Sequence, residues 1–461
     1  MTIDKIDKST CSKARHSRDP RFDGMFFIAV KTTGIFCRPV CPAKLPKEEN
    51  VHYYGLAASA MADGYRPCLR CRPDSAPRSP AWNGVQTTVT RGLSMLGEIP
   101  PKKVTNIAER LGISERYFNK LITSSISLSP KQYQTMQQAM FAKQLLQQSH
   151  ASVIDVALAA GYASARQLQR AMQTYCKMPP SKLRGNTKYL TSSAITLRLS
   201  FRPPYHWDYV RDFLAVRAIK GVEVVTENSY SRNCNIHGEI GQFTATYNPK
   251  VNGFDVSIIM DNLKYLYQLV EQIKRMLDVN AQPELISASL HKAGLADAKV
   301  TQGLRLPTTY SLFEAGCRAI IGQQVSVKAA MGQVALFTET LGMKYTEGKT
   351  RRYAFPAPED VAGRSLAFLK MPQLRKQAIS DFATLCANNP CPSYDDVLAI
   401  KGIGEWTVSY MKMRGDGDPD IYLSGDLIVK KAAQWFETDE AQAAPWRSYL
   451  TLQLWHLYNQ K

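Results

Sequence analysis

The chain has 461 residues and a formal net charge of +19, and 44% of its residues are hydrophobic. This length exceeds what one hydrophobic core accommodates and indicates three or four domains. The polar start MTIDKIDKST contains no signal-peptide core, and no apolar run approaches the roughly 20 residues of a membrane span, so we expect a cytoplasmic protein with no membrane partner. Ten cysteines without a secretion signal favour metal binding or catalysis over disulfides.

The positive charge is unevenly distributed along the chain. Residues 1–185 contain 27 Lys and Arg against 12 Asp and Glu, whereas residues 186–461 contain 31 against 27. A basic segment of this size indicates a phosphate-bearing partner, with solubility alone as the simpler alternative. The C-terminal part has no such excess, so a DNA contact there requires a local site.

The first motif is a set of two cysteine pairs. Three residues separate Cys37 from Cys41, and two separate Cys68 from Cys71. Four thiolates at such spacing predict one tetrahedral Zn²⁺ site and no organic cofactor; a purely structural zinc is the alternative. GIFCRPVCPAKLP and DGYRPCLRCRPD resemble the N-terminal domain of Ada-type methylphosphotriester repair proteins over residues 11–74. The resemblance implies that Cys37 is both a zinc ligand and the nucleophile that accepts a methyl group.

Two helical units follow a Pro- and Ser-rich linker at 73–83. The units, 104–122 and 153–184, have apolar residues at helical spacing, with an N-cap predicted at Ser114 and a turn at Gly161. The tandem pair resembles the DNA-binding domain of AraC-type transcription activators, and a plain helical bundle is the alternative. The resemblance implies double-stranded DNA and RNA polymerase as partners. It places the second helices in the major groove, with the candidate DNA contacts Arg116, Asn119, Arg166, Gln167 and Arg170.

The remaining sequence changes from strand-like to helical. Residues 194 to about 280 alternate in the manner of strands, with a helical stretch near 263–277, and from about 284 the pattern is helical with short loops. In LAIKGIGEWTVSYMKMRG, Gly402 and Gly404 enclose a turn between two helices, and Asp426 lies twenty-two residues after Gly404. Hairpin and aspartate together resemble the helix-hairpin-helix glycosylases. Further segments extend the resemblance to AlkA-type 3-methyladenine DNA glycosylases over about 194–461.

This second resemblance implies a base-excision site. Asp426 is then the catalytic carboxylate, and Trp406, Tyr410 and Trp455 line the pocket for the flipped base, although core packing explains any single aromatic. Trp406 stands where bifunctional relatives carry a Schiff-base lysine, so we expect base removal alone. Gln324 stands where family members insert a leucine into the base stack, and it is a poorer apolar wedge.

The sequence therefore predicts a multidomain chain. The expected order is a small α/β zinc domain (1–76), an all-α tandem helix-turn-helix (84–185), an antiparallel-sheet subdomain (194–283) and a helical helix-hairpin-helix subdomain (284–461), the last two forming an α+β AlkA-like glycosylase. The alkyltransferase domain of complete Ada proteins is not expected, because no Pro-Cys-His-Arg tetrapeptide occurs.

The predicted function is DNA alkylation repair coupled to transcriptional activation, in a bacterial cytoplasm and at the nucleoid. One alternative is a transcription regulator whose glycosylase-like domain only binds DNA. Another is a glycosylase whose front half is a zinc-stabilised DNA clamp.

Overall fold

The computed structural model describes residues 7–19, 22–73, 85–184, 194–347 and 350–460. The chain separates into two compact units, residues 1–134 and 135–461. The predicted linkers at 73–83 and 185–193 lie almost wholly outside the described residues. Among the helices that the structure describes, none combines the length and apolarity of a membrane crossing.

The first unit begins with a small α/β domain. Its sheet has the order β3-β1-β2-β4, in which β1 is antiparallel to both neighbours and β2 is parallel to β4. Both faces of β1 are covered, because Ile28 packs with Cys11 of α1 while Ala29 packs with Ala60 of α2. The elements are α1 (Lys8–Ser17), β1 (Phe27–Val30), β2 (Ile35–Cys37), η2 (Glu48–Asn50), β3 (Val51–Tyr54), α2 (Ala57–Ala62) and β4 (Arg66–Pro67).

The same unit continues with three helices, α4 (Val85–Leu96), α5 (Val104–Arg110) and α6 (Glu115–Ile126). Gly112 makes the turn between α5 and α6 with a φ of 69°. Ser114 caps α6 as predicted, since its hydroxyl accepts a hydrogen bond from the Tyr117 amide at 3.3 Å. The first helix-turn-helix is thereby confirmed.

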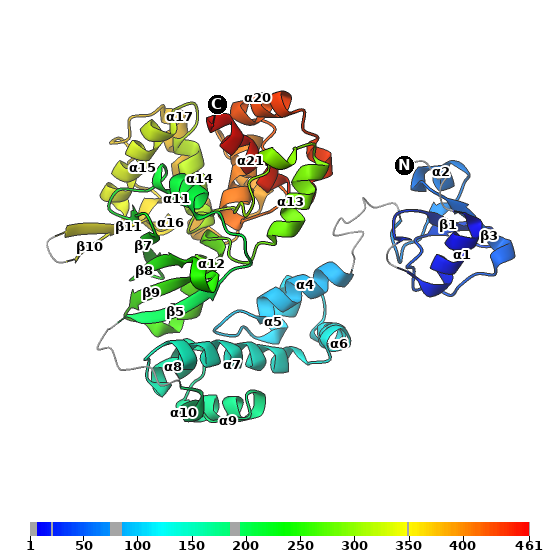
Figure 1. Ribbon diagram of the computed structural model, residues 1–461, viewed down its shortest axis with the longest axis horizontal. Helices are drawn as coiled ribbons and strands as arrows, with labels where there is room; N and C mark the ends of the chain where they lie inside the picture. Colours follow the sequence, from blue (N-terminus) through cyan, green and yellow to red (C-terminus); the bar gives the residue numbers. More distant parts are fainter. Residues whose placement is uncertain (1–6, 20–21, 74–84, 185–193, 348–349, 461) are drawn as a thin grey trace. The chain divides into compact units, whose positions relative to one another are not determined.

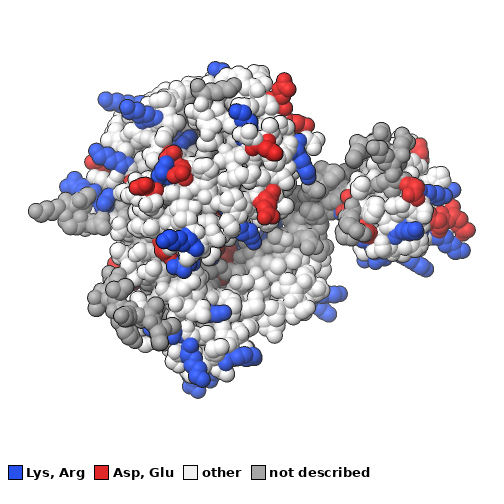
Figure 2. Space-filling view, viewed as in Figure 1, with Lys and Arg blue, Asp and Glu red and all other residues white. Residues whose placement is uncertain are grey.

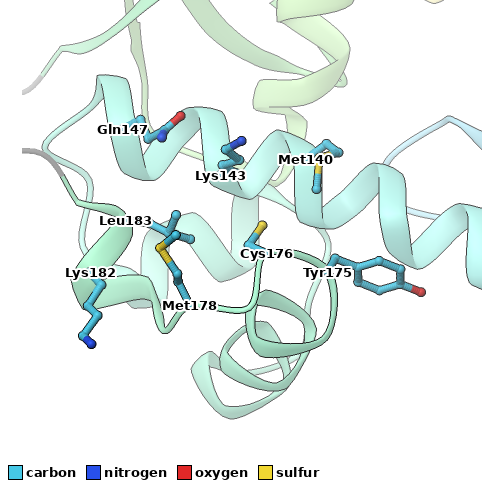
Figure 3. Close-up of a pocket in the computed structure, with 8 residues that line it drawn as sticks. All are labelled: Met140, Lys143, Gln147, Tyr175, Cys176, Met178, Lys182 and Leu183. Atoms are coloured by element: carbon cyan, nitrogen blue, oxygen red, sulfur yellow. The ribbon is translucent and has the colours of Figure 1, made fainter.

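The second unit begins with the second helix-turn-helix. Its helices are α7 (Pro130–Gln148), α8 (Val153–Ala159), α9 (Ala165–Tyr175) and α10 (Pro180–Leu183). Gly161 has a φ of 73° at the turn, and Ser164 caps α9. A surface hollow of about 450 Å³ lies between α7 and the segment that follows α9 (Figure 3). Its lining includes none of the predicted DNA contacts.

A five-stranded antiparallel sheet follows, in the order β5-β9-β8-β7-β6 (Figure 1). Along β5, buried Leu197 and Leu199 alternate with exposed Arg198, as the sequence pattern predicts. Helix α12 packs against β8, because Leu269 closely approaches Gly241. The elements are β5 (Ile195–Ser200), α11 (Trp207–Ala215), β6 (Glu223–Val225), β7 (Ser229–Ile236), β8 (Glu239–Asn248), η3 (Pro249–Val251), β9 (Gly253–Met260), η4 (Leu263–Tyr265) and α12 (Leu266–Met276).

The rest of the unit is helical except for one hairpin. Helix α19 runs directly into a π-helical turn, η6. The elements are α13 (Pro283–Lys292), η5 (Asp297–Lys299), α14 (Leu312–Ile321), α15 (Val327–Leu341), β10 (Met343–Glu347), β11 (Thr350–Ala354), α16 (Pro358–Val361), α17 (Gln373–Asn388), α18 (Tyr394–Leu398), α19 (Glu405–Met411), η6 (Lys412–Asp416), α20 (Leu427–Phe436), η7 (Glu440–Ala443) and α21 (Arg447–Asn459). The predicted fold class is confirmed.

The hairpin β10–β11 corrects the expectation of helices with short loops after residue 284. Its local sequence is highly charged, and tertiary contacts hold it in place. The Tyr353 amide donates to the Gly221 carbonyl at 3.0 Å, and the Tyr345 hydroxyl donates to Asn233 of β7. These partners lie more than a hundred residues away, so a reading of local periodicity did not find the hairpin.

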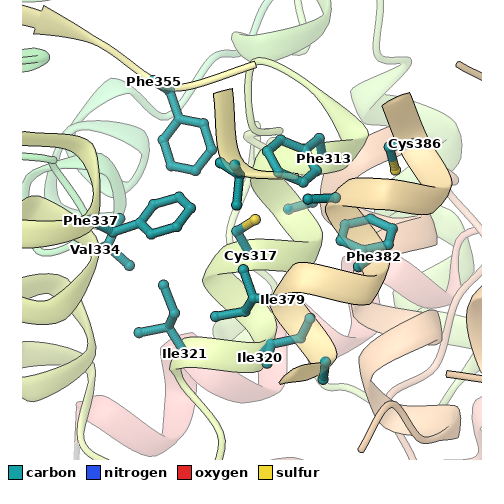
Figure 4. Packing of buried hydrophobic residues seen from close by; sticks show 14 of the residues in the cluster. Phe313, Cys317, Ile320, Ile321, Val334, Phe337, Phe355, Ile379, Phe382 and Cys386 are labelled. Carbon is teal, nitrogen blue, oxygen red and sulfur yellow. The ribbon is translucent and has the colours of Figure 1, made fainter. Parts of the chain in front are cut away.

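Helix α14 is the centre of the large helical core (Figure 4). Its buried face includes Phe313, Cys317 and Ile320, and the Phe382 ring of α17 stacks on Phe313 at 5.5 Å between centroids. Gly316 allows this approach, because a Cβ atom there would lie 2.3 Å from the Phe382 ring. The core thus holds α17 and α14 at fixed spacing beneath the glycine hairpin that follows α18.

Gly316→Ala is expected to lower the free energy of unfolding of this unit by about 1–3 kcal/mol, because overpacking outweighs the gain in helix propensity. Thermal or urea unfolding of the full chain measures the change. Gly332→Ala in α15 is the control: nothing lies within 4 Å of its Cβ position, so the same substitution should stabilise by about 0.5–1 kcal/mol. Equal effects at the two positions would contradict the packing argument.

Candidate metal centre and base-excision site

The four predicted cysteines converge at one end of the small sheet. Cys37 ends β2, Cys41 follows in the next turn, and Cys68 and Cys71 come after β4. Their four sulfur atoms all lie within 4.8 Å of one another. Arg38 ties the two pairs together: its backbone amide donates to the Cys71 sulfur at 3.4 Å and its guanidinium to the Cys71 carbonyl at 3.1 Å.

This arrangement fits Zn²⁺. A tetrahedral ion with Zn–S bonds of about 2.3 Å places its sulfur ligands about 3.8 Å apart, within the observed spread. In the absence of a cation, hydrogen bonding to Cys41 and Cys71 raises the pKa of Cys37, which opposes four thiolates side by side. A divalent cation at the centre of the sulfurs removes that opposition. The cluster is a four-cysteine zinc site, as the sequence predicted.

Cys37 differs from the other three cysteines in exposure. Cys41, Cys68 and Cys71 are buried, whereas Cys37 is partly exposed. A cavity of about 410 Å³ opens beside Cys37, and Thr32, Thr33 and Lys44 contribute to its lining. The lining is otherwise mainly apolar, with Ile28, Val30 and Leu45 among its members, so the Cys37 sulfur lies at the edge of an open, largely apolar cavity.

The glycine hairpin lies between α18 and α19, as predicted. Gly402 has a φ of 98°, a conformation that side-chain-bearing residues rarely adopt, and Gly404 is the N-cap residue of α19. The Gln323 side-chain amide donates to the Gly402 carbonyl at 3.0 Å and to the Thr407 hydroxyl at 3.2 Å. The loop before α15 is therefore attached to the hairpin.

Gln324, the predicted wedge, lies in that same loop. Its side chain is exposed and its backbone is left-handed, with a φ of 57°. Its carbonyl oxygen accepts a hydrogen bond from the Arg375 guanidinium at 3.1 Å. The hydrogen bond to Arg375 therefore holds an exposed side chain in a loop that Gln323 attaches to the hairpin.

Asp426 is the N-cap residue of α20. Its Oδ1 atom accepts hydrogen bonds from the amides of Ile428 and Val429, both at 3.0 Å, and from the Trp455 indole at 3.2 Å. Within the described part of the chain, Oδ2 has no hydrogen-bond partner. The start of a helix favours a negative charge, and the hydrogen bonds to Oδ1 anchor the carboxylate through this one oxygen.

The three predicted aromatic residues connect to Asp426 in different ways: Trp455 is hydrogen-bonded to it, Trp406 contacts the neighbouring Gly425, and Tyr410 stacks on Trp406. Trp406 and Tyr410 stack with centroids 5.4 Å apart and 25° between their planes. Trp406 also contacts Gly425, where a Cβ atom would lie 3.4 Å from the indole. All three aromatic residues and Asp426 are partly exposed. The structure thus brings the predicted pocket residues to one place.

The predicted DNA contacts of the two helix-turn-helix units lie on α6 and α9. Arg116, Arg166, Gln167 and Arg170 are exposed. Two of the predicted contacts form side-chain hydrogen bonds to the nearby backbone. The Asn119 amide donates to the Glu115 carbonyl, and the Gln167 side-chain oxygen accepts from the Ala163 amide. Figure 2 shows Lys and Arg side chains at α9 and α10, with no acidic side chain visible there on that face.

Two arginines near the aromatic pocket escaped the sequence analysis. The guanidinium carbons of Arg217 and Arg414 lie 3.9 Å and 4.5 Å from the Phe213 ring centroid. The Arg414 guanidinium carbon also lies 5.9 Å from the Tyr410 ring centroid. Arg217 lies in the turn after α11 and Arg414 in η6, and arginine is common in both settings, so no local signal distinguished these two from surface residues.

The fold and the two sites define a class of protein: a zinc-cysteine domain and a tandem helix-turn-helix joined to a helix-hairpin-helix glycosylase. Comparison with protein families agrees. The metal binding domain of Ada matches residues 10–74, a helix-turn-helix domain matches residues 107–186, and the AlkA N-terminal domain matches residues 196–311.

Whole-chain similarity extends this result. A probable bifunctional transcriptional activator/DNA repair enzyme AlkA of Mycobacterium tuberculosis is 31% identical over 97% of this chain and 96% of its own length. DNA-3-methyladenine glycosylase 2 of Escherichia coli is 27% identical over 56% of this chain and 96% of its own length. The Escherichia coli enzyme Ada is 36% identical over 26% of this chain and 32% of its own length. This chain belongs to the family of bifunctional transcriptional activator/DNA repair enzymes.

Removing one zinc ligand is expected to unfold the N-terminal domain. In Cys68→Ala, zinc content should fall below one ion per chain, because zinc binding supplies much of the folding free energy of so small a domain. Metal analysis and two-phase thermal unfolding measure this, and the transition of residues 135–461 should remain. Cys11→Ala, a buried cysteine outside the cluster, should keep its zinc. Full zinc occupancy in Cys68→Ala would contradict the four-ligand site.

Proposed function

We propose that this chain detects and repairs DNA alkylation by two separate reactions. Cys37 takes a methyl group from DNA methylphosphotriesters in a single turnover, and the C-terminal part excises alkylated bases of the 3-methyladenine type. The observation that carries the proposal is the pairing, in one chain, of an accessible cysteine in a four-sulfur zinc site with a carboxylate anchored between aromatic rings.

The methyl transfer uses the exposure of Cys37. Zinc, held by the four cysteines, keeps the thiolate ionised at neutral pH. The sulfur attacks the methyl carbon, a C–S bond forms, and the C–O bond breaks with its electron pair on the phosphate oxygen. A methylated phosphate carries no charge, so the anionic sulfur approaches it without repulsion. The product is an ordinary phosphodiester and an S-methylcysteine that is not regenerated.

Base excision uses Asp426 and the three aromatic residues. A base must leave the helical stack before its glycosidic bond is accessible, at a cost of a few kcal/mol. The ring faces of Trp406, Tyr410 and Trp455 attract a cationic alkylated base by about 0.5–2 kcal/mol per good contact. Asp426 then stabilises the sugar cation and orients water. Trp406 has no amine for an imine intermediate, which supports a monofunctional enzyme.

The loop that contains Gln324 and the hairpin at Gly402 and Gly404 bind damaged DNA. The amides at the start of α19 are placed to bind a phosphate, with Gly402 and Gly404 allowing the backbone to approach. Gln324 enters the space that the flipped base leaves. Its link to Arg375 supports this role, because it stabilises the exposed side chain in one position.

The tandem helix-turn-helix binds promoters of alkylation-response genes and recruits RNA polymerase at the nucleoid. Residues of α6 and α9, the exposed Arg116, Arg166, Gln167 and Arg170 with the partly exposed Asn119, contact bases or phosphates in the major groove. The alternative is a regulator with a non-catalytic glycosylase-like domain. It is disfavoured because Asp426 is anchored through one oxygen by two amides and the Trp455 indole, and because Trp406 and Tyr410 stack on each other.

Asp426→Asn tests the base-excision role. Asparagine preserves the cap of α20 but removes the charge, so release of 3-methyladenine from methylated DNA should fall a hundredfold or more, in order of magnitude. Methyl transfer to Cys37, measured in the same tube with labelled methyl groups, should be unchanged.

The matched control is Asp439→Asn, since Asp439 is also an aspartate N-cap in this unit and its carboxylate accepts from the Ala441 amide at 2.9 Å. Its base release should equal that of the unaltered chain. Near-normal release by Asp426→Asn would assign the chemistry to another carboxylate.

Methylation of Cys37 is expected to raise promoter affinity tenfold or more at low salt. Four thiolates on one zinc ion carry a charge of about −2, and methylation leaves about −1. Unit charges several ångströms apart at an effective dielectric constant near 20 repel by a few kcal/mol before screening, so the gain should shrink as salt rises. Promoter binding of unmethylated and methylated protein at two salt concentrations measures this effect.

Cys37→Ala is the partner variant in this experiment. It also removes one thiolate charge but cannot accept methyl, so it should partly mimic the methylated protein where zinc is retained. Equal affinities of the unmethylated and methylated proteins at low salt would rule out the electrostatic switch, even with Cys37 proven as the acceptor.

A further inference from the structure

We infer that Arg414 and Arg217 form a cationic wall behind Tyr410 that stabilises negative charge on the departing base, and that this wall determines which bases are released quickly. The inference rests on the proposed glycosylase function and deepens it. It names two specificity-determining residues at the Tyr410 end of the stacked Trp406–Tyr410 pair, whereas Asp426 lies at the Trp406 end.

Arg414 is an unusual buried cation. Its residue is 4% exposed, and its Nε and Nη1 atoms have no hydrogen-bond partner within the described structure. Its guanidinium lies over two rings, 4.5 Å from the centroid of Phe213 and 5.9 Å from that of Tyr410. Burial lowers the pKa of Arg414 to about 10, so the side chain stays charged at neutral pH.

Arg217 adds a second charge to the same wall. Its guanidinium carbon lies 3.9 Å from the Phe213 ring centroid, and its guanidinium donates to the Phe213 carbonyl at 3.3 Å. Over the described ranges, no carboxylate lies within 4.0 Å of either arginine. Both charges are therefore balanced mainly by aromatic rings.

The nearest acidic residues are already paired. Glu223 and Glu314 form a closed ring of ion pairs with Arg232 and Arg318, with N–O distances between 2.5 and 2.8 Å. Two carboxylates and two guanidinium groups leave that ring neutral. Arg217 and Arg414 therefore add positive charge that no carboxylate of this ring neutralises. Because the effective dielectric constant is lower in a buried region than at the surface, this charge acts on other groups over a longer distance.

A line of contacts connects this excess charge to the reacting bond. Asp426 adjoins Gly425, Gly425 contacts Trp406, Trp406 stacks on Tyr410, and Tyr410 adjoins Arg414. This row of contacts therefore has a negative end at Asp426 and a positive end at the arginines. Cleavage of the glycosidic bond creates the complementary charges, because the sugar becomes cationic while the bond's electron pair moves onto the base nitrogen.

The benefit depends on the charge of the base. A neutral base leaves as an anion and later takes a proton from water, so the cationic wall lowers the barrier to its departure. A cationic N-alkylated base leaves as a neutral molecule, and the wall opposes its binding. The arginines therefore speed the release of neutral damaged bases. They also weaken the preference for cationic bases that aromatic rings alone would produce.

Arg414→Met tests the wall with two substrates, duplexes that contain hypoxanthine as a neutral base or 7-methylguanine as a cationic base. A unit charge roughly 10 Å away at an effective dielectric constant near 20 changes a rate by about tenfold. Single-turnover release of hypoxanthine should fall about tenfold, while release of 7-methylguanine should stay the same or rise. Arg414→Lys, which retains the charge, should keep most of the original ratio of the two rates.

Arg305→Met is the matched control. Arg305 is likewise buried, has two unpartnered nitrogens and lies over a tyrosine ring, that of Tyr205, away from the pocket residues. It should leave the ratio of the two rates unchanged. An equal change of both rates in Arg414→Met, or no release of hypoxanthine by the unaltered chain, would overturn the inference. Failure of the unaltered chain to release either base would instead defeat the proposed glycosylase function.

Discussion

The base-excision site depends on one capped helix. Asp426 begins α20, and its Oδ1 atom holds two amides of that helix and the indole of Trp455 on α21. A single oxygen atom thus fixes the carboxylate, the start of a helix and one aromatic wall. The second wall follows, because Trp406 packs against the neighbouring Gly425. In the proposed base excision, a charge held in this way needs no rearrangement as the sugar cation forms, and such preorganisation is the main source of electrostatic catalysis.

The features that the sequence predicted well are those that local chemistry determines. Cys37 and its three partners are identified by their spacing along the chain, since two closely spaced cysteine pairs are typical of tetrahedral zinc sites. The helix-turn-helix units are identified by a cap such as Ser114 and a turn glycine such as Gly161, both of which are visible within a few residues. The position of Asp426 could also be predicted, because it lies at a fixed number of residues after the glycine hairpin.

The features that the sequence missed arise from contacts between distant segments. Hairpin β10–β11 is held by Gly221 and Asn233, far from it in the chain. Arg414 resembles any helical arginine until the fold places it between Phe213 and Tyr410 and leaves it without a carboxylate. Propensity and periodicity carry no information about such partners, whereas the buried charge becomes evident once the core is assembled.

The π-helical turn at Lys412–Asp416 has a consequence for changes in chain length. A π-turn holds more residues than an α-helical turn, so deleting one residue would let it relax into an unbroken α-helix. That relaxation would rotate Tyr410 and the residues before it by about 100° relative to Gly415, which packs on α14. The orientation of the pocket is therefore encoded in the number of residues as well as in their identity. Homologous chains that share this pocket should conserve the length of the turn.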